Sequence, residues 1–193
     1  MTPTWRSRSP RRRLGGRGRS VTLAGQGAGP DRRPERGGGR VRLHARIDGV
    51  TNLEALRRGM VGEGPRAGWE ETIGARIAEV EPGRVVVELD VHAGHRHSGG
   101  VVQGGVITQI ADAAMGMSLM TEQEEGLANT TIELKINFLR PVVEGRLRAV
   151  GRVVEMRNTL LFSEADVLDA EGRLVARASS TCLAIQLPPR PQP

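Results

Sequence analysis

Apolar and polar residues alternate in several stretches of this chain, and each such stretch predicts a β-strand with one buried face. The clearest is Arg84–Val91, in which every second residue is valine or leucine. The turn Pro82-Gly83 separates it from a strand expected over Thr72–Glu81. Asp169–Gly172 has the composition of a hairpin turn between two alternating runs. After residue 129, four longer strands are expected, over Thr130–Leu139, Arg146–Glu155, Thr159–Asp169 and Leu174–Ile185.

Two segments have a helical pattern instead. Thr51 followed three residues later by Glu54 matches a capping box, which predicts a short helix ending at Gly59. Over Val106–Thr121, apolar residues occupy most sides of a helix, so this helix is expected to be buried. The order is helix, two strands, buried helix and four strands. It predicts an α+β fold in which one helix covers the apolar face of an antiparallel sheet.

Charge divides the chain into unequal parts. Residues 1–46 contain 13 Arg against only Asp31 and Glu35, a net charge of +11, whereas the rest of the chain is acidic. With so few apolar residues, we expect residues 1–46 to be a disordered basic extension. The alternative is an arm that binds RNA or DNA phosphates. Arg outnumbers Lys throughout, with Lys135 as the single lysine, and this general bias favours the first interpretation. Residues 47–187 then form one domain, and 188–193 form a Pro-rich tail.

Composition excludes several classes of protein. No apolar run approaches the ~18 residues that a membrane span needs, and no hydrophobic segment follows the arginines at 11–13 as in an export signal, so we expect a cytoplasmic protein. One cysteine, Cys182, rules out an internal disulfide framework and a multi-cysteine zinc site. It lies in an alternating run, which favours a buried packing role over a nucleophilic one. The two Trp, two Phe and absent Tyr argue against stacking of nucleic-acid bases.

The candidate chemistry lies where the buried helix begins. Gly104-Gly105 at a helix start allows a ligand to approach first-turn N–H groups, which suit an anion or a carbonyl oxygen that gains negative charge. Tight packing is the alternative reason for two glycines. Asp112 lies two turns further on, and Thr108, Gln109 and Gly116 continue a narrow strip of polar or small residues around it. We interpret Asp112 as a carboxylate in a cleft rather than on an ordinary solvated face.

Three histidines, His92, His95 and His97, precede this helix. As a metal site the cluster lacks helical spacing and a clear fourth ligand other than Asp90. We therefore expect a polar loop, no metal ion and no cofactor.

The residues around this helix resemble the PaaI-like acyl-CoA thioesterases of the hotdog fold. That family has Asn-x-x-Gly-x-x-His-Gly-Gly, then an acidic residue seven positions after the second Gly, and Gly105 to Asp112 has this spacing. The stretches Glu133–Pro141 and Glu164–Ala176 are also similar, and the similarity extends over about residues 52–186. Two positions depart from the pattern: His97 stands where the family has Asn, and Gln103 where it usually has His.

The resemblance implies a long central helix wrapped by a curved antiparallel sheet. It implies a homodimer or a dimer of dimers, with the active site at the dimer interface and acyl-coenzyme A as substrate. Asp112 would activate water or attack the thioester carbonyl, and the Gly105 N–H would polarise that carbonyl. Gln103 and His97 would support them, and the expected substrate-binding residues are Gly104, Thr108, Gly116, Arg157 and Asn158. Arg157 could meet the coenzyme phosphates or be an ordinary surface residue.

Two other functions remain open. One is a non-catalytic hotdog protein that binds acyl-CoA. The other is a hydratase on the same fold, which needs a catalytic histidine after the helix, and no histidine follows His97.

Overall fold

The computed structural model describes residues 51–63, 68–124 and 126–186, so the basic segment 1–46 and the tail 188–193 lie outside the described residues. In chain order the elements are α1 (Asn52–Met60), α2 (Gly68–Ile73), β1 (Ala75–Glu81), β2 (Arg84–Asp90), a 3-10 turn (Ala93–His95), α3 (Gly104–Glu122), β3 (Leu127–Phe138), β4 (Arg146–Arg157), β5 (Leu160–Leu168) and β6 (Leu174–Gln186).

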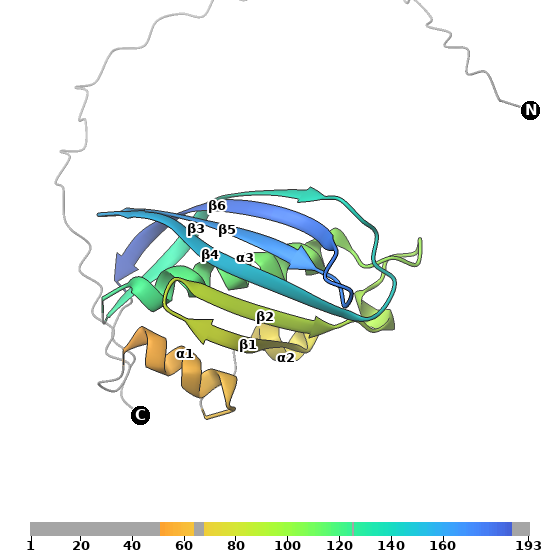
Figure 1. Ribbon diagram of the computed structural model, residues 1–193, viewed down its shortest axis with the longest axis horizontal. Coiled ribbons are helices and arrows are strands. Elements are labelled where there is room, and N and C mark those ends of the chain that lie inside the picture. The colour runs from red at the N-terminus through yellow and green to blue at the C-terminus, as the bar shows by residue number, and fades with distance from the viewer. Residues whose placement is uncertain (1–50, 64–67, 125, 187–193) are drawn as a thin grey trace, which may run out of the picture. The chain divides into compact units, whose positions relative to one another are not determined.

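The six strands form one antiparallel sheet in the order β1-β2-β4-β5-β6-β3. Its inner face curves around α3, and α1 and α2 lie beside β1 (Figure 1). This is the hotdog arrangement expected from the sequence. No helix within the described ranges is long and apolar enough to cross a membrane.

The core lies between α3 and the inner face of the sheet. Val85, Val87 and Leu89 of β2 are completely buried, as their alternation predicts. On the helix, Ile110, Ala114 and Met115 are completely buried as well and belong to the same cluster. Burying such side chains contributes roughly 1.5–3 kcal/mol each, which makes α3 the main stabilising partner of the sheet.

The helix and the sheet come into close backbone contact at Gly151 of β4. A Cβ atom added there would lie 2.2 Å from the carbonyl oxygen of Ala114, inside α3. Backbone cannot yield as a flexible side chain can, so only glycine fits at this crossing. Gly151 therefore sets how near α3 comes to β4.

Most sequence predictions of the elements are confirmed. Thr51 caps α1 by accepting a hydrogen bond from the Glu54 N–H at 3.2 Å. The strand expected over Thr72–Glu81 is wrong in its first part, because Thr72 and Ile73 end α2 and the strand begins only at Ala75. A six-residue helix has too few residues to produce a recognisable period.

The alternation expected along β3 is also interrupted. Ile132 is a β-bulge residue between the pairs Thr131–Cys182 and Glu133–Thr181, and its side chain is 55% exposed. A bulge adds one residue to a strand, so side chains beyond it point to the opposite face from the one that regular alternation predicts. Leu134 and Ile136 face the helix, as expected. On the other side of the bulge, Thr131 points toward the helix, and Ile132, which alternation places there, does not.

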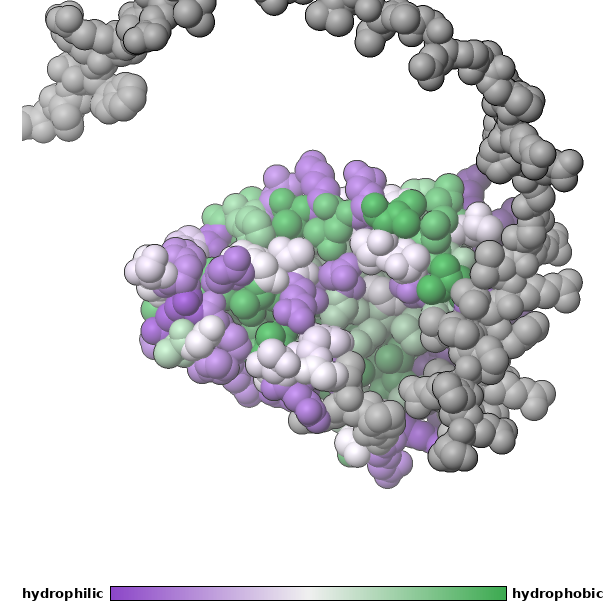
Figure 2. Space-filling model, turned by 180° about the vertical axis from the view of Figure 1, so that it is seen from behind, coloured by the Kyte–Doolittle hydropathy of each residue, from purple (hydrophilic) through white to green (hydrophobic). Residues whose placement is uncertain are grey.

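β3 is an edge strand, paired only with β6. Apolar side chains are exposed along it and just after it, including Ile132, Phe138 and Leu139. Seen from the side opposite to Figure 1, the described surface carries several apolar areas among polar ones (Figure 2). An unpaired edge with exposed apolar side chains is typical of a surface that pairs with another chain.

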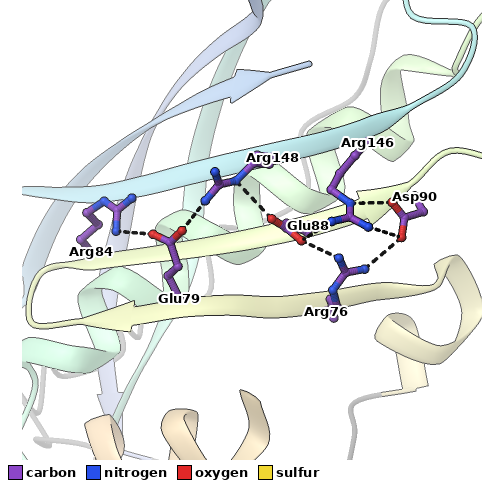
Figure 3. A network of polar contacts seen from close by, with 7 residues as sticks. All are labelled: Arg76, Glu79, Arg84, Glu88, Asp90, Arg146 and Arg148. Carbon is purple, nitrogen blue, oxygen red and sulfur yellow. Dashed lines mark hydrogen bonds and ion pairs between the residues drawn. The ribbon is translucent and has the colours of Figure 1, made fainter. Parts of the chain in front are cut away.

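The outer face of the sheet carries a network of ion pairs across β1, β2 and β4 (Figure 3). Glu88, the least exposed member, contacts the guanidinium groups of Arg76, Arg146 and Arg148. Beside them on this face, Val86 and Val150 are paired with each other and buried, although α3 lies on the opposite side of the sheet. The aliphatic stems of the long charged side chains therefore cover an apolar floor.

Candidate active site

Gln103 caps the N-terminus of α3. Its side-chain Oε1 accepts a hydrogen bond from the Val106 N–H at 3.2 Å. Its own N–H donates to the carbonyl oxygen of His95 at 2.8 Å. The residue that takes the place of the family histidine thus fixes the helix start with its oxygen, and its amide nitrogen has no partner among the described residues.

Gly104 and Gly105 form the first turn of α3, and their N–H groups have no hydrogen-bond partner within the described ranges. A Cβ atom at Gly105 would lie 2.6 Å from Oε1 of Gln103, and one at Gly104 would lie 3.1 Å from the Phe138 ring. A side chain at Gly104 would crowd the Phe138 ring, and one at Gly105 would displace the capping oxygen of Gln103, so packing, one of the two interpretations of this pair, contributes to the choice of glycine. The same absence of side chains keeps the N–H groups accessible to a ligand.

Asp112 lies on α3, partly buried, seven residues after Gly105. Its Oδ1 accepts a hydrogen bond from the Thr131 hydroxyl of β3 at 2.9 Å. Asp112 forms no ion pair with any described residue. The second carboxylate oxygen also has no described partner, so Asp112 can accept a proton there.

Thr131 is a candidate site residue that no pattern in the sequence indicated. A regular alternation back from Leu134 would turn Thr131 outward, and only the bulge at Ile132 turns it toward Asp112. Its hydroxyl also lies 3.7 Å from the sulfur of Cys182, which is completely buried. No simple pattern in one sequence reveals a bulge, and a threonine beside a polar run was the only available signal.

Thr108 and Gly116 lie one turn before and one turn after Asp112, both partly buried. The Thr108 hydroxyl donates to the Gly104 carbonyl at 2.9 Å, so its hydrogen serves the helix itself. The Gly116 carbonyl accepts a hydrogen bond from the side chain of Asn129 on β3 at 2.9 Å. These two residues border Asp112 and keep the strip around it narrow.

His97 is exposed in the loop before α3. Its Nδ1 accepts a hydrogen bond from the Gly99 N–H at 2.9 Å, within the same loop. The structure does not bring His97 into contact with Asp112 in one chain. Its role in orienting water, which the resemblance implies, stays a prediction.

Arg157 and Asn158 lie at the turn between β4 and β5. Arg157 is 76% exposed and pairs with Glu155 at 3.5 Å. Asn158 has a positive φ of 34°, as a tight turn requires. The neighbouring residue Leu161 packs with Leu119 near the C-terminal end of α3, so within one chain this turn lies far from Gly105. Contact of these residues with coenzyme phosphates stays a prediction.

His92 and His95 form hydrogen bonds with the backbone of their own loop. The Nδ1 of His92 accepts from the Gly94 N–H at 3.0 Å, and the Nδ1 of His95 accepts from the His92 N–H at 3.2 Å. Across the described parts of the chain, no three His, Cys, Asp or Glu side chains are grouped to hold a metal ion.

Known proteins with similar sequences are hydrolases by name. A family model described as the thioesterase superfamily matches residues 99–176. A proposed esterase of Saccharolobus solfataricus is 34% identical over 103 residues, which cover 53% of this chain and 73% of that protein. A 1,4-dihydroxy-2-naphthoyl-CoA hydrolase of Listeria monocytogenes is 27% identical over 116 residues, covering 59% and 93%.

Solved structures have the same fold. A thioesterase family protein from Silicibacter pomeroyi is 28% identical with a TM-score of 0.62, covering 70% of this chain and 98% of that one. The Escherichia coli PaaI protein is 18% identical with a TM-score of 0.63, covering 72% and 99%, and this likeness shows the fold alone. Sequence, fold and the described helix start thus agree, and the chain belongs to the thioesterase superfamily as a PaaI-like thioester hydrolase of the hotdog fold.

Proposed function

We propose that this enzyme hydrolyses acyl-coenzyme A thioesters to a free acid and coenzyme A, with Asp112 as the base. The observation that carries the proposal is the setting of the Asp112 carboxylate. It is held by one neutral hydroxyl, and it lies on the helix whose first two glycines present N–H groups without a described partner. The coenzyme A hydrolase named among the relatives supports coenzyme A as the thiol part of the substrate.

The Gly105 N–H and the Asp112 carboxylate of one chain cannot both contact the same thioester group. Gly105 and Asp112 are seven residues apart, which at about 1.5 Å per residue is about 10 Å along the helix axis. A thioester carbonyl is far smaller than this. The site therefore combines Gly105 of one chain with Asp112 of a second chain, and the exposed edge strand β3 supports such a pairing.

Hydrolysis then follows from the chemistry of these groups. Asp112 removes a proton from a water molecule as the water oxygen attacks the thioester carbon. The carbonyl oxygen becomes an oxyanion, and the N–H of Gly105 at the positive end of the helix dipole stabilises it. The C–S bond breaks, and the proton held by Asp112 passes to the leaving thiolate. Thr131 fixes one oxygen of Asp112 throughout, so that the other faces the water. Direct attack by Asp112 on the thioester carbon is the alternative first step.

A panel of acyl-CoA thioesters assayed for released thiol tests this function. We expect turnover on at least one member, and Asp112→Asn should abolish most of it. Binding of acyl-CoA without release of thiol would favour the non-catalytic acyl-CoA-binding protein instead. Light scattering at micromolar protein should report at least a dimer, and an active monomer would contradict the shared site.

A further inference from the structure

His95 is a buried polar side chain that the proposed reaction does not use. It is 4% exposed in the loop between β2 and α3. Its Nδ1 accepts a hydrogen bond from the His92 N–H, and its Nε2 lies 2.9 Å from the carbonyl oxygen of Ile73. Because a neutral imidazole has one donor and one acceptor, these partners assign the hydrogen to Nε2. Both ring nitrogens are therefore satisfied by backbone groups.

The ring joins two segments that are far apart in the sequence. Ile73 is the last residue of α2, and its carbonyl is one that a helix end leaves without an intrahelical partner. His95 supplies the missing donor and thereby holds the loop against α2. The 3-10 turn Ala93–His95 adds a second restraint, since the His95 ring also accepts the N–H of His92, the residue that caps the turn.

The backbone of the same residue reaches the active site. The carbonyl oxygen of His95 accepts the hydrogen bond from the Gln103 N–H at 2.8 Å. Gln103 in turn caps α3 and lies directly before the two glycines. His95 thus connects the end of α2 to the start of α3 through two hydrogen bonds, one made by its ring and one by its backbone carbonyl.

The neutral form of the ring is the form that this arrangement needs. A second ring proton on Nδ1 would point at the His92 N–H and break that bond. Burial, aided by the neighbouring His92, lowers the pKa of His95 below its ordinary value, although the bond to Ile73 opposes this. His95 is therefore neutral near pH 7, and its two bonds persist there.

We infer that His95 is a positioning residue, which holds Gln103 and thereby the first-turn N–H groups of α3 in place for the thioester carbonyl. The inference rests on the proposed function for its catalytic consequence. Its structural part, the restraint of the α3 start by His95, can be measured without any substrate. A displacement of ~1 Å in a reacting group costs up to ~10²-fold in rate, so a modest loosening of this loop suffices to affect turnover.

The experiment compares His95→Ala with Asn52→Ala. Asn52 is 3% exposed, and its side chain donates to the carbonyl oxygens of Leu127 and Glu124 after the other end of α3. It is thus a buried side chain with two backbone bonds, but it does not touch the helix start. Two readouts are compared at a temperature well below both melting midpoints: amide hydrogen exchange at Gln103 and Val106, and steady-state turnover of an acyl-CoA substrate.

We expect His95→Ala to accelerate exchange at Gln103 and Val106 and to lower kcat about 10-fold, with a smaller change in KM. Asn52→Ala should lower the melting midpoint similarly and leave both readouts near wild type. Equal exchange and equal kcat in the two variants would overturn the inference, as would faster exchange with unchanged kcat in an active enzyme. If wild type hydrolyses no acyl-CoA, the proposed function fails, and the exchange data alone decide whether His95 restrains the helix start.

Two further variants keep the test decisive if His95→Ala does not fold. His95→Gln keeps a donor near the position of Nε2 for Ile73, and His95→Asn keeps an acceptor near the position of Nδ1 for the His92 N–H. Each retains one of the two bonds, so each should fall between wild type and His95→Ala in exchange and kcat. Wild-type values in both variants would show that neither bond positions Gln103.

Discussion

On the outer face of the sheet, Glu79 and Asp90 each pair with two arginines, whereas on the inner side the one polar partner of Asp112 among the described residues is the neutral hydroxyl of Thr131. The hydrogen bond from Arg84 holds the pKa of Glu79 below its ordinary value, and Arg146 does the same for Asp90. A carboxylate paired in this way is a poor base, because its charge is already stabilised.

The difference separates a structural role from a chemical one. The outer carboxylates are held by their arginines in the ion-pair network of that face. Asp112 has no arginine beside it in the described parts of the chain, and one of its oxygens is left for a water molecule. Variants on the two sides should therefore change different properties of the enzyme.

The largest expected effect is on turnover at Asp112. Asp112→Asn is nearly isosteric and removes the proposed base, so we expect a loss of at least ~10²-fold in kcat with folding intact. Asp90→Asn on the outer face is the matched control and should keep kcat within about two-fold, since it touches no part of the site. Thiol release and melting curves are measured together. Near-normal turnover of Asp112→Asn would contradict the mechanism.

Gln103 should have a smaller effect. Gln103→Ala removes the cap of α3 but leaves the Gly105 N–H, so we expect about a 10-fold loss in kcat/KM, equivalent to about 1.4 kcal/mol of barrier. Gln103→His restores the usual family residue and should be tolerated. A loss as large as that of Asp112→Asn would give Gln103 a direct chemical role.

Thr131 should follow, because it orients a base that remains present without it. Thr131→Val keeps the branched shape and removes the hydroxyl, and we expect kcat to fall about 5-fold, since a neutral hydrogen bond contributes about 1 kcal/mol. Thr131→Ser should recover most of the loss. Thr130→Val, on the exposed face next to it, is the control and should behave as wild type.

Glu88 offers the converse change on the outer face. Glu88→Gln leaves three arginines without a full counter-charge, and we expect the free energy of unfolding to fall by about 1 kcal/mol with kcat unchanged. Urea denaturation measures the first and thiol release the second. A drop in kcat comparable to that of Thr131→Val would mean that the two sides are coupled.

The pH dependence of stability should show two separate windows. The folded-state pKa of His95 lies below 6.5, so as pH falls the unfolded chain takes up this proton first and stability decreases below about pH 6.5. For Glu79 and Asp90 the folded pKa is also lowered, so their contribution is present above about pH 4.5 and is lost as pH falls further. Melting curves of His95→Gln should lack the first decrease only. If that variant has the wild-type dependence of stability on pH, His95 does not cause the first decrease.

The sequence predicted the repeating parts of this molecule and missed its irregular ones. Val85, Val87 and Leu89 were placed correctly because alternation reports burial directly, and the apolar helix was expected to be buried for the same reason. The bulge at Ile132 and the short helix α2 escaped, since both depend on tertiary packing rather than on a period. The same holds for the candidate site. The spacing of Gly105 and Asp112 could be seen in the sequence, whereas the position of Thr131 depends on the register of β3 against β6.

The contact at Gly151 bears on how this enzyme can vary during evolution. The backbones of α3 and β4 touch there, so the helix cannot settle deeper or tilt without a collision. Alanine at that position would bring its methyl group against the carbonyl oxygen of Ala114 and displace α3, and with it Asp112, from β4. A single methyl group, at a buried residue that takes no part in the proposed reaction, would thus change the position of the proposed base.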